Sequence, residues 1–296
     1  QLMQIQRSGY RLMQLVNQIL DLRKLETGHE QLRVAQGNVI RFLAEISLAF
    51  KEVATSKNIS FVYPDTNIKA LKDVSFMLKS GKTLAILGKT GSGKSTILDL
   101  IGRLYDIEKG TILVDDKIIS ELNLNSLRES IGYVPQDAFL FSDTIKNNIM
   151  FGKEDATEED VIEAAKNATV HKNIVSFNNG YDTILGERGI TLSGGQKQRV
   201  SIARAIIKKP DILLFDDCLS AVDTETEEKI LKNLVKLTKG KTTIIVSHRV
   251  SSAKNADQII VLEDGEIIQS GNHQSLINTD GYYKELYTKQ LSEKEM

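Results

Sequence analysis

The sequence has little of what marks secreted or low-complexity chains. Its 296 residues include one cysteine, Cys218, and three prolines. A single cysteine excludes an internal disulfide framework and fits a reducing compartment. So few prolines, together with a hydrophobic fraction of 41%, argue against a disordered chain.

Excess charge and long apolar runs are also missing. The formal net charge is −1, so we expect no general attraction to nucleic acid or to an anionic membrane. No run of about 18 apolar residues exists that could span a bilayer as a helix. The polar, Gln-rich start is unlike a signal peptide, and it does not begin with Met. We therefore expect a soluble, cytosolic fragment of the mixed α/β class.

Residues 1–57 differ in pattern from the rest of the chain. Apolar residues recur at helical spacing from Ile5 to Leu22, which predicts an amphipathic helix of about five turns. Asn38 could cap a second helix that runs towards Phe50.

Beyond residue 57, short apolar runs alternate with helical stretches. Continuous runs at 84–87, 212–215 and 244–246 indicate buried parallel strands in a layered α/β sheet. Asp264 and Gly265 lie between two further apolar runs and predict a tight antiparallel hairpin.

A glycine-rich segment follows the strand at 84–87 and opens a helix predicted over 96–105. Together with the first helical residue, it reads Gly88, Lys89, Thr90, Gly91, Ser92, Gly93, Lys94, Ser95 and Thr96. This is the P-loop pattern in its expected context. The glycines let backbone N–H groups point at a phosphate chain. Lys94 supplies charge to the β- and γ-phosphates, and the Ser95 hydroxyl can ligate Mg²⁺.

Two further motifs accompany the P-loop. Asp216 and Asp217 end the strand at 212–215, where a carboxylate normally holds Mg²⁺ in a P-loop fold. A second glycine-rich turn precedes the helix predicted over 197–208 and consists of Leu192, Ser193, Gly194, Gly195 and Gln196. It offers further backbone donors to a phosphate. One nucleotide rarely needs two such turns, which suggests that the second one binds a partner's nucleotide.

In this order the motifs resemble the nucleotide-binding domain of an ABC transporter, over residues 58–296. The resemblance implies a P-loop NTPase core with a parallel sheet, an antiparallel β-subdomain and a helical subdomain. That helical subdomain would carry the signature, residues 192–196, which closes over ATP held by an opposite domain. ATP and Mg²⁺ are the implied cofactors, ATP hydrolysis the implied activity, and a second nucleotide-binding domain the implied partner.

The resemblance also assigns roles to single residues. Tyr63 would stack on adenine, with an ordinary strand tyrosine as the alternative. Gln136 would join Ser95 and Asp216 around Mg²⁺ and sense the membrane domain. His248 would contact the γ-phosphate and, with Asp217, arrange the attacking water.

Three stretches imply contact with other domains. Ser220 and Asp223 resemble the loop through which two nucleotide-binding domains communicate. Glu187 and Arg188 resemble the charged loop of exporter-type members, and residues 137–149 resemble the segment that docks on their coupling helices. The implied place is the cytoplasmic face of the plasma (inner) membrane, beside a membrane-spanning domain that this chain lacks.

Asp217 departs from the family pattern. Members that hydrolyse ATP efficiently usually carry Glu there, and Asp is shorter by one methylene, about 1.5 Å. Because a water-positioning group must come within about 2.6–3.2 Å, such a deficit can cost on the order of 10²-fold in rate. The Asp form resembles the slow half of an exporter built from two different subunits, so a heterodimer is favoured over a homodimer.

Residues 1–57 resemble instead a sensor histidine kinase, namely its second dimerisation helix and the start of its ATP-binding domain. The stretch 6–28 carries this resemblance, and a generic coiled-coil helix is the alternative. The kinase phosphoacceptor motif is missing. We expect a foreign or chimeric fragment joined somewhere within 57–70. Two other functions stay open: a signalling protein of the histidine kinase class, and a soluble ABC ATPase that does not transport.

Overall fold

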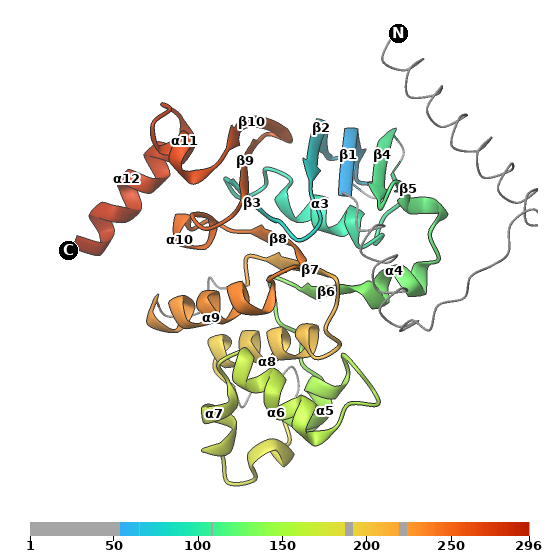
Figure 1. Ribbon diagram of the computed structural model, residues 1–296, viewed down its shortest axis with the longest axis vertical. Helices are drawn as coiled ribbons and strands as arrows, with labels where there is room; N and C mark the ends of the chain where they lie inside the picture. Colours follow the sequence, from blue (N-terminus) through green and yellow to red (C-terminus); the bar gives the residue numbers. More distant parts are fainter. Residues whose placement is uncertain (1–53, 65, 108, 187–191, 219–223, 296) are drawn as a thin grey trace, which may run out of the picture. The chain divides into compact units, whose positions relative to one another are not determined.

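The computed structural model describes residues 54–64, 66–107, 109–186, 192–218 and 224–295 (Figure 1). The two helices predicted within residues 1–53 lie outside these ranges. Among the described residues, every helix is too short or too polar to cross a bilayer.

A mixed six-stranded sheet forms the centre of the described part. Its strand order is β10-β9-β3-β8-β7-β6, and the pairings from β9 to β6 are parallel while β10 is antiparallel to β9. The bounds are β3 Thr83–Gly88, β6 Ile131–Val134, β7 Ile212–Asp216, β8 Thr242–Val246, β9 Gln258–Glu263 and β10 Glu266–Gly271. Asp264 and Gly265, both with positive φ, form the β9–β10 turn. The predicted parallel strands and hairpin are confirmed.

A second, antiparallel sheet has the order β2-β1-β4-β5. Its strands are β1 Ala54–Val62, β2 Lys69–Leu78, β4 Lys109–Val114 and β5 Lys117–Ile118. This is the predicted β-subdomain. β1 pairs with β2 starting at Ala54 and Leu78, so the sheet begins before the domain boundary predicted at residue 57. That boundary stays a prediction.

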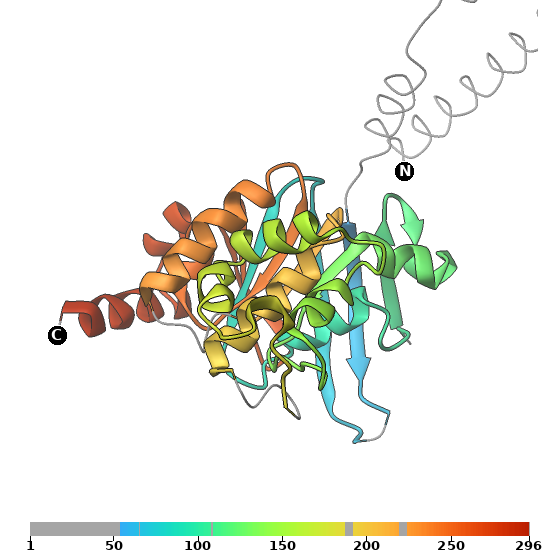
Figure 2. The ribbon, with the colours of Figure 1, turned by 90° about the horizontal axis from the view of Figure 1, so that it is seen from below.

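Helices flank the central sheet and form a layer of their own. Their bounds are α3 Lys94–Ile101, α4 Leu124–Ser130, α5 Ile145–Met150, α6 Glu158–Asn167, α7 His171–Val175, α8 Gly194–Ile206, α9 Thr224–Leu237, α10 Val250–Ala253, α11 His273–Ile277 and α12 Tyr282–Glu295, with single 3₁₀ turns at Ile119–Glu121 and Gly180–Asp182. Helices α5 to α8 pack around a core that includes Val161 and Val200. In Figure 2 this helical layer lies in front of the sheet, as the predicted helical subdomain requires.

Both predicted helices differ from the observed ones at each end: α3 spans Lys94–Ile101 instead of 96–105, and α8 spans Gly194–Ile206 instead of 197–208. α3 ends at Ile101 instead of residue 105, because Gly102 closes the helix and Arg103 adopts a left-handed φ of 49°. α8 begins at Gly194, three residues before the predicted start, because Ser193 and Gln196 form a capping box. Both signature glycines therefore belong to the first turn of the helix.

Candidate functional site

A cleft of about 540 Å³ opens at the carboxyl ends of β3, β7 and β8. In doubly wound sheets, ligands bind at this edge. Among the residues that line the cleft are Tyr63, Thr90, Gly91, Gly93, Lys94, Ser95, Thr96, Gln136, Asp216, Asp217 and His248. The structure thus brings together residues that the sequence singles out from five separate stretches of chain.

The P-loop curls tightly between β3 and α3. Gly88 and Gly93 have φ of 149° and 94°, and a Cβ on either would collide with the carbonyl oxygen of Leu262 or Ala70. Only glycine fits these two positions. Inside the curl, the buried Lys94 donates its ammonium hydrogens to the carbonyl oxygens of Gly88, at 3.0 Å, and Lys89, at 2.7 Å.

The charges in the cleft are held away from water. Burial lowers the pKa of Lys94 and raises the pKa of Asp216 and Asp217. Each shift means that solvation of the charged form has been lost. A polyphosphate anion and a divalent cation are the ligands that would stabilise a lysine and two carboxylates in this setting.

Ser95 and Asp216 suit a magnesium ion. The Ser95 hydroxyl donates to Asp216 Oδ1 at 2.9 Å, so two oxygen ligands already touch. No group of three or more His, Cys, Asp or Glu side chains that could hold a metal occurs among the described residues. Mg²⁺ needs none, since it takes one or two carboxylates and completes its shell with waters and substrate phosphates.

Asp217 and His248 face each other at the end of the cleft. Asp217 has a left-handed φ of 40°, and its N–H donates to Val246 O at 2.9 Å. The His248 N–H donates to Asp217 Oδ1 at 3.4 Å, while His248 Nε2 lies 4.0 Å from Asp217 Oδ2. The two side chains are close but outside hydrogen-bonding distance.

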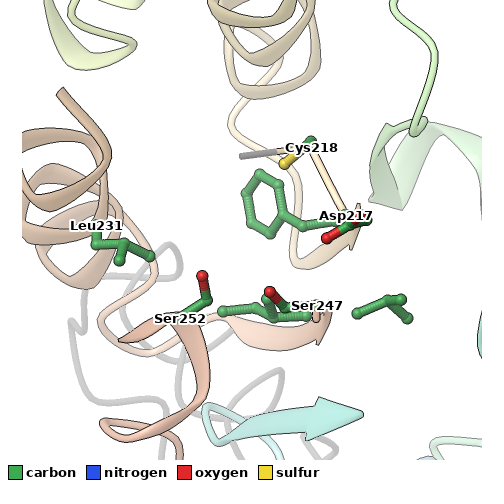
Figure 3. A pocket seen from close by; sticks show the side chains of 8 residues that line it. Asp217, Cys218, Leu231, Ser247 and Ser252 are labelled. Carbon is green, nitrogen blue, oxygen red and sulfur yellow. The ribbon is translucent and has the colours of Figure 1, made fainter. Parts of the chain in front are cut away.

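A second, small cavity lies on another side of Asp217 (Figure 3). Phe215, Cys218, Ser247 and Ser252 contribute to its wall. Cys218 is buried, and burial raises the pKa of its thiol well above the usual range.

Tyr63 and Gln136 both line the cleft. The Tyr63 hydroxyl and Thr96 Oγ1 are hydrogen-bonded at 2.9 Å, which ties β1 to the start of α3. Gln136 has an exposed side chain, and its carbonyl oxygen accepts from Gln198 Nε2 at 3.0 Å. The buried Gln198, on α8, also donates to Pro135 O at 3.1 Å and so joins the helical layer to the loop of Gln136.

The remaining P-loop residues do not line the cleft with their side chains. Lys89 Nζ pairs with Glu263 at 2.7 Å and is exposed, and Ser92 is buried. Several cleft residues were not predicted as site residues, namely Ile68, Lys69, Ala70, Lys72, Val246, Asp264 and Gly265. They come from β2 and the residue before it, from β8 and from the β9–β10 turn, where the sequence carries no nucleotide-binding motif.

The signature lies apart from this cleft. None of the residues 192–196 lines it, and Ser193 and Gly194 are exposed at the start of α8. The Ser193 side chain accepts from the N–H of Gln196 at 3.3 Å. The residues predicted to contact other domains, Glu187, Arg188, Ser220 and Asp223, lie outside the described residues.

An exposed aromatic group lies on the segment predicted to dock on coupling helices, residues 137–149, and on Phe151, which directly follows α5. Phe139 and Phe141 contact edge to face at 5.2 Å, and Phe141 and Phe151 lie 4.7 Å apart. The Arg204 guanidinium stands 5.4 Å from the Phe141 ring, and its Nε donates to Asn148 O at 2.8 Å. Exposed apolar groups of this kind are typical of interaction surfaces.

The fold and the cleft define a P-loop nucleotide-binding domain. A family model described as "ABC transporter" matches residues 71–220, and the chain belongs to this family. Its described part is an α/β ATPase domain of the exporter type. The helical layer and the antiparallel sheet agree with this assignment.

Individual proteins resemble the chain over about four fifths of its length. It is 49% identical over 235 residues to "Uncharacterized ABC transporter ATP-binding protein YfiB" of Bacillus subtilis (strain 168), covering 79% of this chain and 41% of that protein. It is 49% identical over 236 residues to "ATP-binding cassette sub-family B member 6" of Xenopus tropicalis, covering 80% and 28%. A solved structure, "Structure of a bacterial Atm1-family ABC exporter with ATP bound", matches with 42% identity and a TM-score of 0.77, covering 81% and 42%.

The chain thus spans well under half the length of these relatives. The comparisons give no support to the histidine kinase resemblance of residues 1–57, which stays a prediction.

Proposed function

We propose that this chain is the ATP-binding and ATP-hydrolysing subunit of an exporter-type ABC transporter. The observation that carries the proposal is the cleft in which Lys94, Ser95, Asp216, Asp217 and His248 converge. ATP binding there would close the domain onto a partner, hydrolysis would reopen it, and an attached membrane domain would alternate its access.

The phosphate chain of ATP would lie along the P-loop. Lys94 would exchange its carbonyl partners for the β- and γ-phosphate oxygens, where its charge counts more than in water. The start of α3 adds backbone N–H groups and a favourable dipole. Tyr63, fixed to Thr96 through its hydroxyl, would offer its ring to the adenine base.

Two side chains would arrange the attacking water and the γ-phosphate, and three others would hold Mg²⁺. Ser95, Asp216 and Gln136 would hold Mg²⁺, which would supply positive charge to the phosphate oxygens. Asp217 would orient the attacking water, and its raised pKa favours accepting a proton. His248 would contact the γ-phosphate from the far side.

We also propose a partner of the same kind. Ser193 and its neighbours lie away from this chain's own cleft and are exposed, as a signature needs to be to bind ATP held by a second nucleotide-binding domain. The aromatic group of Phe139, Phe141 and Phe151 would contact the membrane domain. The complex would lie at the cytoplasmic face of the plasma (inner) membrane.

We further propose that this chain supplies the slow ATP site of a heterodimer. The distance of 4.0 Å between Asp217 and His248 supports this, because the shorter side chain leaves the pair apart. An intact signature would let the chain complete the partner's faster site.

Steady-state phosphate release tests the proposal. Lys94→Ala should abolish MgATP turnover, since the phosphates lose their fixed counter-ion. Lys82→Ala is the matched control. This exposed lysine lies just before β3, at the end of the strand away from the P-loop, and pairs with Asp257. Its loss should therefore leave turnover unchanged. Equal turnover of wild type and Lys94→Ala would refute the assignment.

A further inference from the structure

The helix α12 presents one partly buried face to the rest of the domain. Tyr283, Leu286, Tyr287 and Gln290 are buried or half-buried, whereas the residues between them are exposed. This spacing of three and four places all four side chains on one side of the helix. The first three contact the core cluster of α10, β3 and β9, and Gln290 is the polar member of the set.

Both ends of the Gln290 side-chain amide are hydrogen-bonded to one loop. Oε1 accepts from the Val250 N–H at 2.8 Å, and Nε2 donates to the His248 carbonyl oxygen at 2.9 Å. The two partners are backbone groups two residues apart, 40 or more residues earlier in the sequence. An amide is the side chain that can donate and accept at once in this way.

The loop has a particular need for these contacts. Val250 is the first residue of α10, and the side chain of its N-cap residue, Arg249, makes no capping hydrogen bond. The first N–H groups of a helix have no partner within the helix. The Val250 N–H is one of these groups, and Gln290 supplies its acceptor from a distant helix.

His248 is held between the site and α12. Its N–H donates to the Asp217 carboxylate, and its carbonyl oxygen accepts from Gln290. The 3.4 Å bond to Asp217 is longer than the 2.9 Å bond to Gln290, so Gln290 makes the firmer contact.

α12 is itself anchored near the P-loop strand. The Tyr283 hydroxyl is 2.7 Å from His273 Nδ1, and the Tyr283 N–H donates to Gln269 Oε1 at 3.0 Å. Tyr283 is fully buried in the cluster that contains Ala85 and Leu87 of β3. In Figure 1, α12 is the red helix that ends at the C-terminus, with α10 nearby in orange.

We propose that Gln290 is a positioning residue for His248: by fixing the backbone of residues 248 and 250, it sets where the imidazole meets the γ-phosphate. The proposal rests on the proposed role of His248 in ATP recognition. It adds that this recognition depends on α12, which contributes no residue to the cleft.

The test measures how strongly the chain prefers MgATP to MgADP, because only the γ-phosphate distinguishes the two. Dissociation constants of both nucleotides for the full 296-residue chain come from competition with a fluorescent ADP analogue. His248→Ala should reduce the preference. Gln290→Met, which keeps the length and apolar contact of the side chain but removes both hydrogen bonds, should reduce it on the order of fivefold.

Two comparisons separate positioning from simple loss of structure. Lys289→Ala changes the exposed neighbour on the same turn and should leave the preference unchanged. In a His248→Ala background, Gln290→Met should have no further effect, because the residue it positions is gone. Gln290→Ala should match Gln290→Met if the hydrogen bonds matter and the packing does not.

The outcomes that overturn the proposal are distinct. If His248→Ala lowers the preference but Gln290→Met does not, Gln290 is not a positioning residue and the proposed function survives. A further loss in the double variant would show that Gln290 acts independently of His248. If His248→Ala leaves the preference intact, the γ-phosphate role of His248 fails, and this inference fails with it.

Discussion

Replacing Asp217 with Glu isolates the feature that we hold responsible for slow hydrolysis. Asp217 Oδ2 lies 4.0 Å from His248 Nε2, and the additional methylene of Glu extends the carboxylate by about 1.5 Å. That is enough to bring the two groups within hydrogen-bonding distance and to move the carboxylate towards the water. A correction of this size can be worth up to about 10²-fold in rate.

The backbone conformation of residue 217 predicts a small loss of stability in Asp217→Glu, beside the expected gain in hydrolysis rate. Asp217 has a φ of 40°, and Asp tolerates the left-handed region better than Glu does. We therefore expect Asp217→Glu to unfold at a slightly lower temperature than the wild type while it turns over faster. Faster turnover in a less stable variant would separate side-chain reach from general stabilisation.

The assay is steady-state phosphate release at saturating MgATP. Asp217→Ala should lower the small wild-type rate only slightly, since the carboxylate is already badly placed. Asp211→Glu makes the same chemical change at an exposed residue just before β7 and should leave the rate unchanged. The reasoning is refuted if wild-type turnover is already on the order of 1 s⁻¹ or faster and Glu does not raise it.

Three further results are expected. Because burial raises the pKa of Asp217 above the ordinary 3.8, the ionised carboxyl destabilises the folded chain. Asp217→Asn should therefore raise the unfolding temperature at pH 7, a gain that vanishes below about pH 4; equal gains at both pH values would contradict this. Cys218 is buried and should react with a maleimide quickly only after unfolding in denaturant, so rapid labelling of the native chain would count against its packing. Deleting residues 1–50 leaves β1 intact and should change MgATP affinity by less than about twofold, as titration of the deletion variant would show; loss of binding in a folded variant would make the segment integral.

Local signals predicted a large part of this fold. The strands β3, β7 and β8 are continuous apolar runs whose length and composition suffice to indicate buried parallel strands. The P-loop was equally predictable from the sequence, because the glycines and Lys94 that define its backbone geometry all lie within eight consecutive residues. For the strands and for the P-loop, the residues that determine the structure are neighbours in the sequence, so the sequence pattern alone indicates them.

Contacts between distant parts of the chain were not predictable in the same way. Gln198 meets the loop of Gln136 from 62 residues away, and Gln290 meets His248 from 42. A lone glutamine in a helix carries no mark of its partner until the fold brings the two together. The same holds for Lys72, which reaches the cleft from β2 without any motif.

The ends of helices were also not predictable from the sequence pattern. The apolar pattern after the P-loop continues to Tyr105, yet α3 ends at Ile101, because Gly102 and Arg103 turn the chain. Apolar spacing alone does not distinguish the last turn of a helix from a loop that packs on the same core. Tyr105 contacts the rings of Phe61 and Tyr63. This packing explains why an aromatic residue continues the apolar pattern beyond the end of the helix.

Equilibrium titration of the chain with MgATP tests the central claim most directly. If the cleft is an ATP site built on the P-loop, the wild type binds one ATP per chain. Lys94→Ala then weakens binding by at least about tenfold, since a charge-assisted contact to the phosphates is lost, while Lys82→Ala binds as the wild type does. Equal affinity of the wild type and Lys94→Ala, in folded protein, would contradict the account.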